Sequence, residues 1–225
     1  MQAVKSTAFA PLARELASTG RRFYARGWVL GTSGNFSAVV SRRPLRLAIT
    51  ASAVHKGALR SSDILAIDEQ GGVIGRNAKT PSAEAALHLE IVRREGAGAV
   101  LHTHSVWSTM LSELHAPRGG VELEGYEMLK GLRGVKSHEH REWIPILEND
   151  QDMPRLARAV GEMLQQNGSL RAFLLRRHGL YTWGDTLAEA ERHVEVLEFL
   201  FESVGRLSTL SNRKKERRHG ADQNP

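Results

Sequence analysis

The feature that most constrains this chain of 225 residues is the alternation of short β-rich runs with longer amphipathic segments. Near the amino terminus, apolar residues recur at helical spacing from about residue 6 to 26. The expected strands beyond it are GTSGNFSAVV, PLRLAIT, DILAID, GAVLHTH, WIPIL and AFLLRRHG, and the expected helices are PSAEAALHLEIVRREG, SVWSTMLSELH, MPRLARAVGEMLQQNG and TLAEAERHVEVLEFLFESVGRL. No linker or repeat interrupts this pattern. Residues 1–210 are therefore predicted to form one α/β domain with helices covering a central sheet.

The composition fits one well-formed core, because 41% of the residues are hydrophobic. No apolar run approaches the ~18 residues that span a bilayer, and the amino-terminal stretch MQAVKSTAFAPLAREL lacks the apolar segment of a signal peptide. There are no cysteines, so disulfides and thiolate metal sites are excluded, and any zinc must bind His, Asp or Glu. We therefore expect a cytoplasmic protein with no membrane partner.

The formal net charge of +6 is unevenly distributed along the chain. Residues 213–225 contain five basic and two acidic side chains, a net +3 that is half of the excess. We interpret residues 211–225 as a basic, disordered tail in solvent rather than as a nucleic-acid contact. The body carries the other +3, which suits an anionic small-molecule substrate.

Three histidines are candidates for holding one metal ion. His102 and His104 lie in the expected strand LHTH, where alternate side chains share a face, so both imidazoles point one way and Thr103 points the other. His178 ends the expected strand AFLLRRH, and Gly179 lets the chain turn there. Three neutral imidazoles with open coordination positions are the ligand set of a catalytic zinc. The sequence therefore predicts a divalent metal site, with zinc expected and iron or manganese as alternatives.

A second histidine pair and two carboxylates need separate interpretation. His138 and His140 have the same spacing, but they lie in the charged segment SHEHREW, and we expect them at a pocket rim or on the surface. Glu84 is in the first turn of an expected helix, where an acidic side chain complements the helix dipole. Glu127, in EGYEMLKG, has no local feature that separates it from a surface residue. The other histidines lack ligand spacing and are expected to be structural or solvated: His55, His88, His115, His193 and His219.

Small and hydroxyl-bearing residues indicate an anion site. The run GTSGNFS can bring backbone amides close to an anion. The stretch ITAS and Ser82, at an expected helix start, supply further donors, and Lys56 would add a positive charge. Each feature alone is typical of an ordinary turn, but together with a metal site they predict a phosphorylated ligand.

The order of these motifs resembles the class II aldolase and adducin family. GTSGN, ITAS, PSAE, HTHS and RRHG follow one another over most of residues 27–200. The resemblance implies a class II aldolase-like three-layer αβα sandwich with a mixed central sheet, and a homotetramer with sites at subunit interfaces. It also implies a metal-dependent lyase that acts on a sugar phosphate, and the placement of charge already argues against a nucleic-acid partner.

The resemblance assigns roles to individual residues. His102, His104 and His178 match the metal ligands, and Glu127 matches the catalytic acid/base. The residues that match substrate or phosphate positions are Ser33, Gly34, Asn35, Thr50, Ser52, Ser82 and Glu84. The chain departs from the aldolase pattern at Ala83, where aldolases usually carry a second serine, and at Ala51 and Ala53, where the loop is often TPSG. Glu84 matches a metal ligand of the aldolases, whereas a three-histidine site leaves it lining the pocket.

Within the family, three segments resemble a dehydratase branch of methionine salvage: GYEMLKGL, HEHREWIPILENDQDM and RRHGLYTWGDT. This implies zinc-dependent loss of water from a phosphorylated methylthio sugar. One alternative is a sugar-phosphate aldolase or epimerase, which shares the metal and phosphate motifs. Another is a non-catalytic scaffold similar to adducin heads, which need not keep the three histidines that this chain retains.

Overall fold

The computed structural model describes residues 8–75 and 77–221, and the side chains of residues 211–221 lie outside that description. One eight-stranded sheet runs through the molecule in the order β3-β2-β1-β4-β8-β7-β6-β5. The strands are β1 (Asn35–Arg42), β2 (Leu45–Thr50), β3 (Ile64–Asp68), β4 (Ala99–Thr103), β5 (Gly120–Glu124), β6 (Arg141–Leu147), β7 (Ala172–Leu175) and β8 (Gly179–Gly184). The pair β6–β7 is parallel and the other neighbouring pairs are antiparallel, so the sheet is mixed, as predicted.

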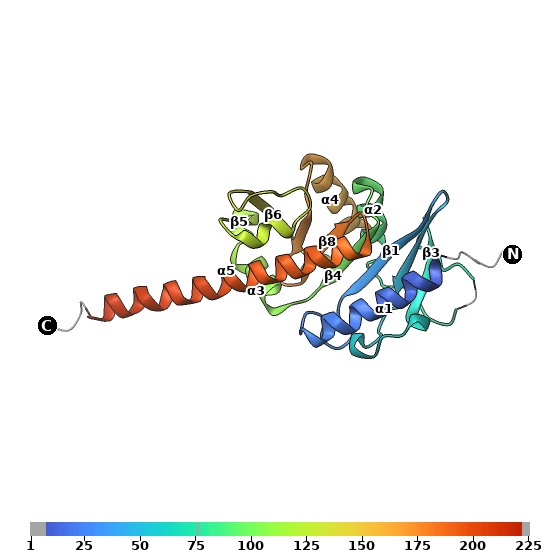
Figure 1. The fold of residues 1–225 in the computed structure, drawn as a ribbon, viewed down its shortest axis with the longest axis horizontal. Helices are drawn as coiled ribbons and strands as arrows, with labels where there is room; N and C mark the ends of the chain where they lie inside the picture. The colour runs from blue at the N-terminus through green and yellow to red at the C-terminus, as the bar shows by residue number, and fades with distance from the viewer. Residues whose placement is uncertain (1–7, 76, 222–225) are drawn as a thin grey trace.

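Helices cover both faces of this sheet. The α-helices are α1 (Phe9–Ala25), α2 (Ala85–Glu95), α3 (Val106–Leu114), α4 (Met153–Gln166) and α5 (Leu187–Ala221), and the short 3₁₀ turns are η1 (Lys56–Ala58), η2 (Ser61–Asp63), η3 (Ala116–Arg118) and η4 (Glu127–Gly131). Helices α2 and α4 pack with one face of the sheet in one apolar cluster. Helices α1, α3 and α5 pack on the other face in two further clusters. This confirms the predicted three-layer αβα architecture (Figure 1).

Local sequence signals explain where the helices begin and end. Ser105 caps α3 by accepting a hydrogen bond from Ser108 N, and Asp152 caps α4 by accepting one from Arg155 N. Gly96 ends α2 in the left-handed conformation, at a φ of 63°. The cap at Ser105 begins α3 directly after the strand that carries two of the candidate metal ligands.

The structure differs from the sequence prediction at two strands. The segment GVELE forms the edge strand β5, which was not predicted. The run AFLLRRHG was predicted as a single strand, but β7 ends at Leu175 and β8 begins at Gly179. His178 therefore lies in the hairpin turn between two strands and not at the end of one. The reason is that strand β8 (Gly179–Gly184) pairs antiparallel with both β4 and β7. The chain must therefore reverse its direction after β7 to form the β7–β8 pair.

Helix α5 is longer than predicted. It crosses the α1 side of the sheet and then extends away from the body of the molecule (Figure 1). Its described backbone includes residues 211–221, while residues 222–225 lie outside the described part, so the division into a domain and a basic tail stays a prediction. No helix among the described residues is long and apolar enough to cross a membrane.

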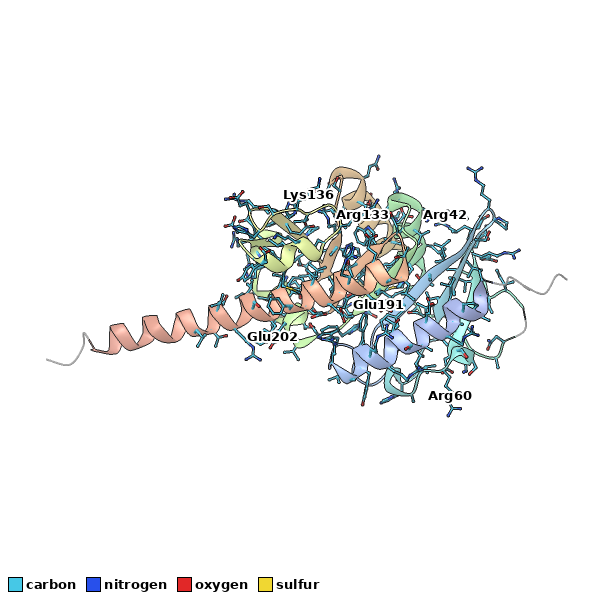
Figure 2. All side chains as sticks on the ribbon, viewed as in Figure 1. Arg42, Arg60, Arg133, Lys136, Glu191 and Glu202 are labelled. Carbon is cyan, nitrogen blue, oxygen red and sulfur yellow. The ribbon has the colours of Figure 1, made fainter. Side chains whose placement is uncertain are left out.

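Helix α5 is attached to helix α1 by an ion pair and to strand β4 by a buried hydrogen bond. Glu191 lies where α5 passes α1 (Figure 2), and its Oε2 is 2.5 Å from Arg22 Nη2. About two helical turns past that contact, the buried Glu198 accepts a hydrogen bond from Thr103 Oγ1 at 2.7 Å. Its other oxygen, Oε2, has no hydrogen-bond partner among the described residues. Burial raises the pKa of Glu198 to about 7, although hydrogen bonds from Ser105 and Thr103 act in the opposite direction.

The raised pKa of Glu198 predicts a pH-dependent stability. The folded carboxyl keeps its proton to higher pH than the unfolded one, so the free energy of unfolding should fall as pH rises from about 4.5 to about 7 and then level off. This difference in pKa between the unfolded and the folded carboxyl corresponds to a decrease in the free energy of unfolding on the order of 3 kcal/mol. Glu198→Gln should remove most of this slope. Urea unfolding of metal-free wild type and variant at pH 5 and pH 8 tests it, and equal slopes in the two proteins would contradict the prediction.

Candidate metal centre and substrate cavity

Strand β4 presents two histidines on the face of the sheet that α2 covers. His102 is fully buried in the strand, and His104 follows its last residue, held by a hydrogen bond from its backbone N–H to Trp28 O at 2.8 Å. Their Nε2 atoms are 2.7 Å apart, and Thr103 between them points to α5 on the opposite face. The structure therefore confirms the predicted alternation of side chains along this strand.

The β7–β8 turn brings a third imidazole to the same place. His178 Nε2 is 3.3 Å from His102 Nε2, and the nitrogen ligand atoms of these two histidines and His104 all lie within 4.8 Å of one another. The turn needs glycine at position 179, because a Cβ there would lie 2.0 Å from the carbonyl oxygen of Thr103. A chain reversal and a strand pairing together place His178.

Burial favours the neutral form of all three imidazoles, and hydrogen bonds orient two of the rings. Burial lowers the pKa of all three, to about 2 for His104, where the neighbouring His102 and His178 lower it further. His102 Nδ1 donates to Leu180 O at 2.9 Å and His178 Nδ1 donates to Asn149 Oδ1 at 3.1 Å, which leaves the Nε2 lone pair of each facing the other. Converging lone pairs of neutral imidazoles repel one another without a cation, so this donor set fits a divalent metal.

Glu84 lies beside two of these histidines. It occupies the N-cap position of α2, and its Oε2 is 3.5 Å from His102 Nε2 while its Oε1 is 3.4 Å from His178 Nε2. These distances place the carboxylate beside the same centre, but the group whose ligand atoms all lie within 4.8 Å of one another consists of the three histidines without Glu84. Its part in metal binding stays a prediction.

A buried chain of hydrogen bonds holds Glu84 in position. Ser37 Oγ lies 2.8 Å from His88 Nδ1, His88 Nε2 donates to Asn35 Oδ1 at 2.5 Å, and Asn35 Nδ2 donates to Glu84 Oε2 at 2.5 Å. His88 is fully buried, and burial lowers its pKa to about 4, so the ring is neutral and can both accept and donate. The Asn35 side chain, predicted near phosphate, is thus engaged with Glu84 and His88.

A cavity of about 350 Å³ opens at the metal centre. It joins His104, His178 and Glu84 to the predicted anion-binding residues, and its lining includes Ser33, Gly34, Asn35, Ser52, Ser82 and Lys56. Thr50 is not part of this lining, because it is fully buried at the end of β2, where its Oγ1 accepts a hydrogen bond from Phe36 N at 3.2 Å. The histidine motif and the predicted anion-binding motif, which are separate in the sequence, therefore share one cavity.

Glu127 is not among the residues that line this cavity. It begins the short turn η4, its side chain is 71% exposed, and it forms an ion pair with Lys130. Lys130, and to a lesser extent His138 at 3.8 Å, lowers the pKa of Glu127. The rival pair is not at the centre either, since His138 faces Glu127 and His140 Nε2 is 2.6 Å from Glu142 Oε2.

Sequence reasoning missed two residues that orient the centre. His88 was interpreted as structural or solvated, yet it is one helical turn after Glu84, a spacing that could have linked the two side chains. Asn149, which accepts from His178, lies in the segment between β6 and α4, and no local pattern distinguishes it.

The comparisons with known proteins identify the family to which the chain is similar. Residues 14–204 match the model of the class II aldolase and adducin N-terminal domain. A methylthioribulose-1-phosphate dehydratase from Methylococcus capsulatus is 46% identical over 202 residues, which are 89% of this chain and 96% of that protein. A protein of the same name from Pseudomonas fluorescens is 43% identical, over 90% of this chain and 96% of that protein.

Solved structures have the same fold. An L-fuculose 1-phosphate aldolase superposes with a TM-score of 0.73 at 23% identity, covering 89% of this chain and 87% of that one. The L-fuculose-1-phosphate aldolase of Thermus thermophilus superposes with a TM-score of 0.69 at 25% identity, covering 91% of this chain and 97% of that one.

Proposed function

This chain belongs to the class II aldolase and adducin N-terminal domain family, and on that premise we propose that it is a methylthioribulose-1-phosphate dehydratase of methionine salvage. The observation that carries the proposal is the convergence of three imidazoles, one fully buried and two partly buried, at one end of a cavity lined by small and hydroxyl-bearing residues. Relatives that carry this name share more than two fifths of their residues with the chain along nearly its full length.

We propose zinc as the metal, held by His102, His104 and His178. Zinc suits this site because it accepts three imidazoles and keeps a further position open for an oxygen of the substrate. When bound, it would act as a Lewis acid on the ketone of the substrate, an effect of several kcal/mol. The chain contributes the orientation of the ligands through Leu180 O and Asn149.

Glu127 would carry the proton transfers from a neighbouring subunit. Within one chain its side chain is exposed and outside the cavity, so it can act at a histidine centre only if a second copy presents it there. The homotetramer implied by the family, with sites at subunit interfaces, supplies such a copy. The ion pair with Lys130 keeps Glu127 ionised and thus able to accept a proton.

The reaction requires a base that later acts as an acid. The substrate carries a ketone at C2, hydroxyls at C3 and C4 and phosphate at C1. The Glu127 carboxylate takes the proton from C3 and returns it to the C4 hydroxyl, which leaves as water. The resulting enol becomes the 2,3-diketone, namely 2,3-diketo-5-methylthiopentyl 1-phosphate. Such general acid–base transfer typically contributes ~10²–10⁴-fold to the rate.

The rival activity is aldol cleavage of a sugar phosphate. The observation that favours it is Glu84, which matches a metal ligand of the aldolases and lies within 3.5 Å of two imidazole nitrogens. The cavity and the histidines suit both reactions, since both begin by activating the same ketone.

Product analysis separates the two reactions. Zinc-loaded protein mixed with methylthioribulose 1-phosphate should form the diketone and water, with no shorter fragment. Release of a two- or three-carbon fragment would replace the dehydratase proposal with an aldolase, and an unchanged substrate would contradict both.

A further inference from the structure

Lys56 is a buried cation beneath the loop that borders the cavity. It begins η1, only 1% of the residue is exposed, and its backbone N–H donates to Gly31 O at 2.8 Å. Its Nζ donates to Thr32 O at 2.9 Å and to Val54 O at 3.0 Å. The lysine thus holds together the two loops that form the anion-binding side of the cavity.

No carboxylate compensates this charge among the described side chains. Lys56 Nζ has two carbonyl partners and no ion pair there, and burial alone lowers its pKa to about 8. A buried ammonium without a counter-ion is costly, so such a residue points to a function. An ammonium has three N–H donors, and the two carbonyl oxygens engage two of them.

The cavity places an anion site next to this charge. Lys56 lines the same cavity as the serines at positions 33, 52 and 82 and the backbone of Gly34. Its positive charge also reaches the metal centre, where it lowers the pKa of His102 and His104. The cavity therefore has one fixed cation at its loop side and a metal-binding group at the other.

We propose that Lys56 is the counter-charge for the dianionic phosphate group of the substrate, which binds between the loop at residues 32–35 and Ser52. The inference rests on the proposed function for the identity of the substrate, but any phosphate monoester dianion would be recognised in the same way. Phosphate supplies the negative charge that the folded chain lacks around Nζ. The bound phosphate and the lysine then stabilise one another.

Inorganic phosphate tests this without catalysis. With zinc-loaded wild type, added phosphate should raise the unfolding temperature, and Lys56→Gln should lose most of that rise. Lys56→Met is the second uncharged variant, in case glutamine prevents folding, and Lys56→Arg should retain part of the rise because it retains the charge. Lys79→Gln is the matched control, since Lys79 is partly exposed and pairs with Asp63 outside the cavity.

Steady-state kinetics separate a binding role from a purely structural one. Loss of a charge-assisted hydrogen bond should raise KM for the sugar phosphate about tenfold to a hundredfold. The value of kcat and the zinc content should change little. Phosphate-induced stabilisation of Lys56→Gln or Lys56→Met equal to that of wild type would overturn the inference. Lysine-dependent phosphate binding in a protein that forms no diketone would instead overturn the proposed function and leave this inference standing.

Discussion

Replacing His104 with alanine is expected to remove bound metal and catalysis together. The imidazole provides one of three converging nitrogens, and its Nε2 lies 2.7 Å from that of His102, so two ligands would remain around an enlarged space. We expect zinc content to fall from about one ion per subunit to near zero. The value of kcat/KM should fall at least ~10³-fold, because the Lewis acid supplies several kcal/mol.

His138→Ala is the matched control for this variant. His138 is also a histidine with i, i+2 spacing, but its side chain is 56% exposed and faces Glu127 instead of the centre. It should retain zinc. Metal analysis of the purified proteins makes the comparison, and a normal zinc content in His104→Ala would remove His104 from the ligand set.

Glu127→Gln is expected to keep the fold and the metal while losing turnover. The side chain is exposed and distant in sequence from the histidines, so its amide should not disturb either the core or the metal ligands. Without a carboxylate the C3 proton has no acceptor, and kcat should fall by ~10²–10⁴-fold with little change in KM. Activity close to that of wild type, measured with full zinc content, would exclude Glu127 from the chemistry.

Mixed oligomers test whether Glu127 acts across a subunit interface. A Glu127→Gln chain retains an intact histidine centre, and a His104→Ala chain retains an intact Glu127. When the two inactive chains are co-expressed, some interfaces should combine one good centre with one good carboxylate, and activity should reappear. Co-purified mixed oligomers without activity would contradict the proposal that Glu127 of one subunit acts at the histidine centre of another.

Periodicity in the sequence was sufficient to predict most strands of the sheet and to place the first two candidate ligands on one face. The alternation of side chains in a strand put His102 and His104 on one face, and the structure keeps them there. The same reasoning was incomplete for His178, because a strand pattern does not reveal where the chain reverses. Its position depends on the pairing of β8 with β4, which is a long-range contact.

Residues that act through tertiary contacts carried little local signal. Asn149 orients His178 from a segment remote in sequence, and no local pattern distinguished it. Lys56 was expected to add a positive charge to the anion site, but the sequence does not show that the side chain is buried and bonded to Thr32 O. Glu127 was identified only by family resemblance, and the single chain leaves it exposed. The contribution that we propose for a second subunit cannot follow from the periodicity of one chain.

The central claim is that dehydration depends on a metal bound by the three histidines. The most direct test of it is one activity measurement under three conditions. Diketone formation from methylthioribulose 1-phosphate is measured with the purified protein, after chelation to verified loss of metal, and after zinc is restored. We expect activity, loss of activity and recovery in that order. Diketone formation at an unchanged rate by the verified metal-free protein would contradict the central role of the metal.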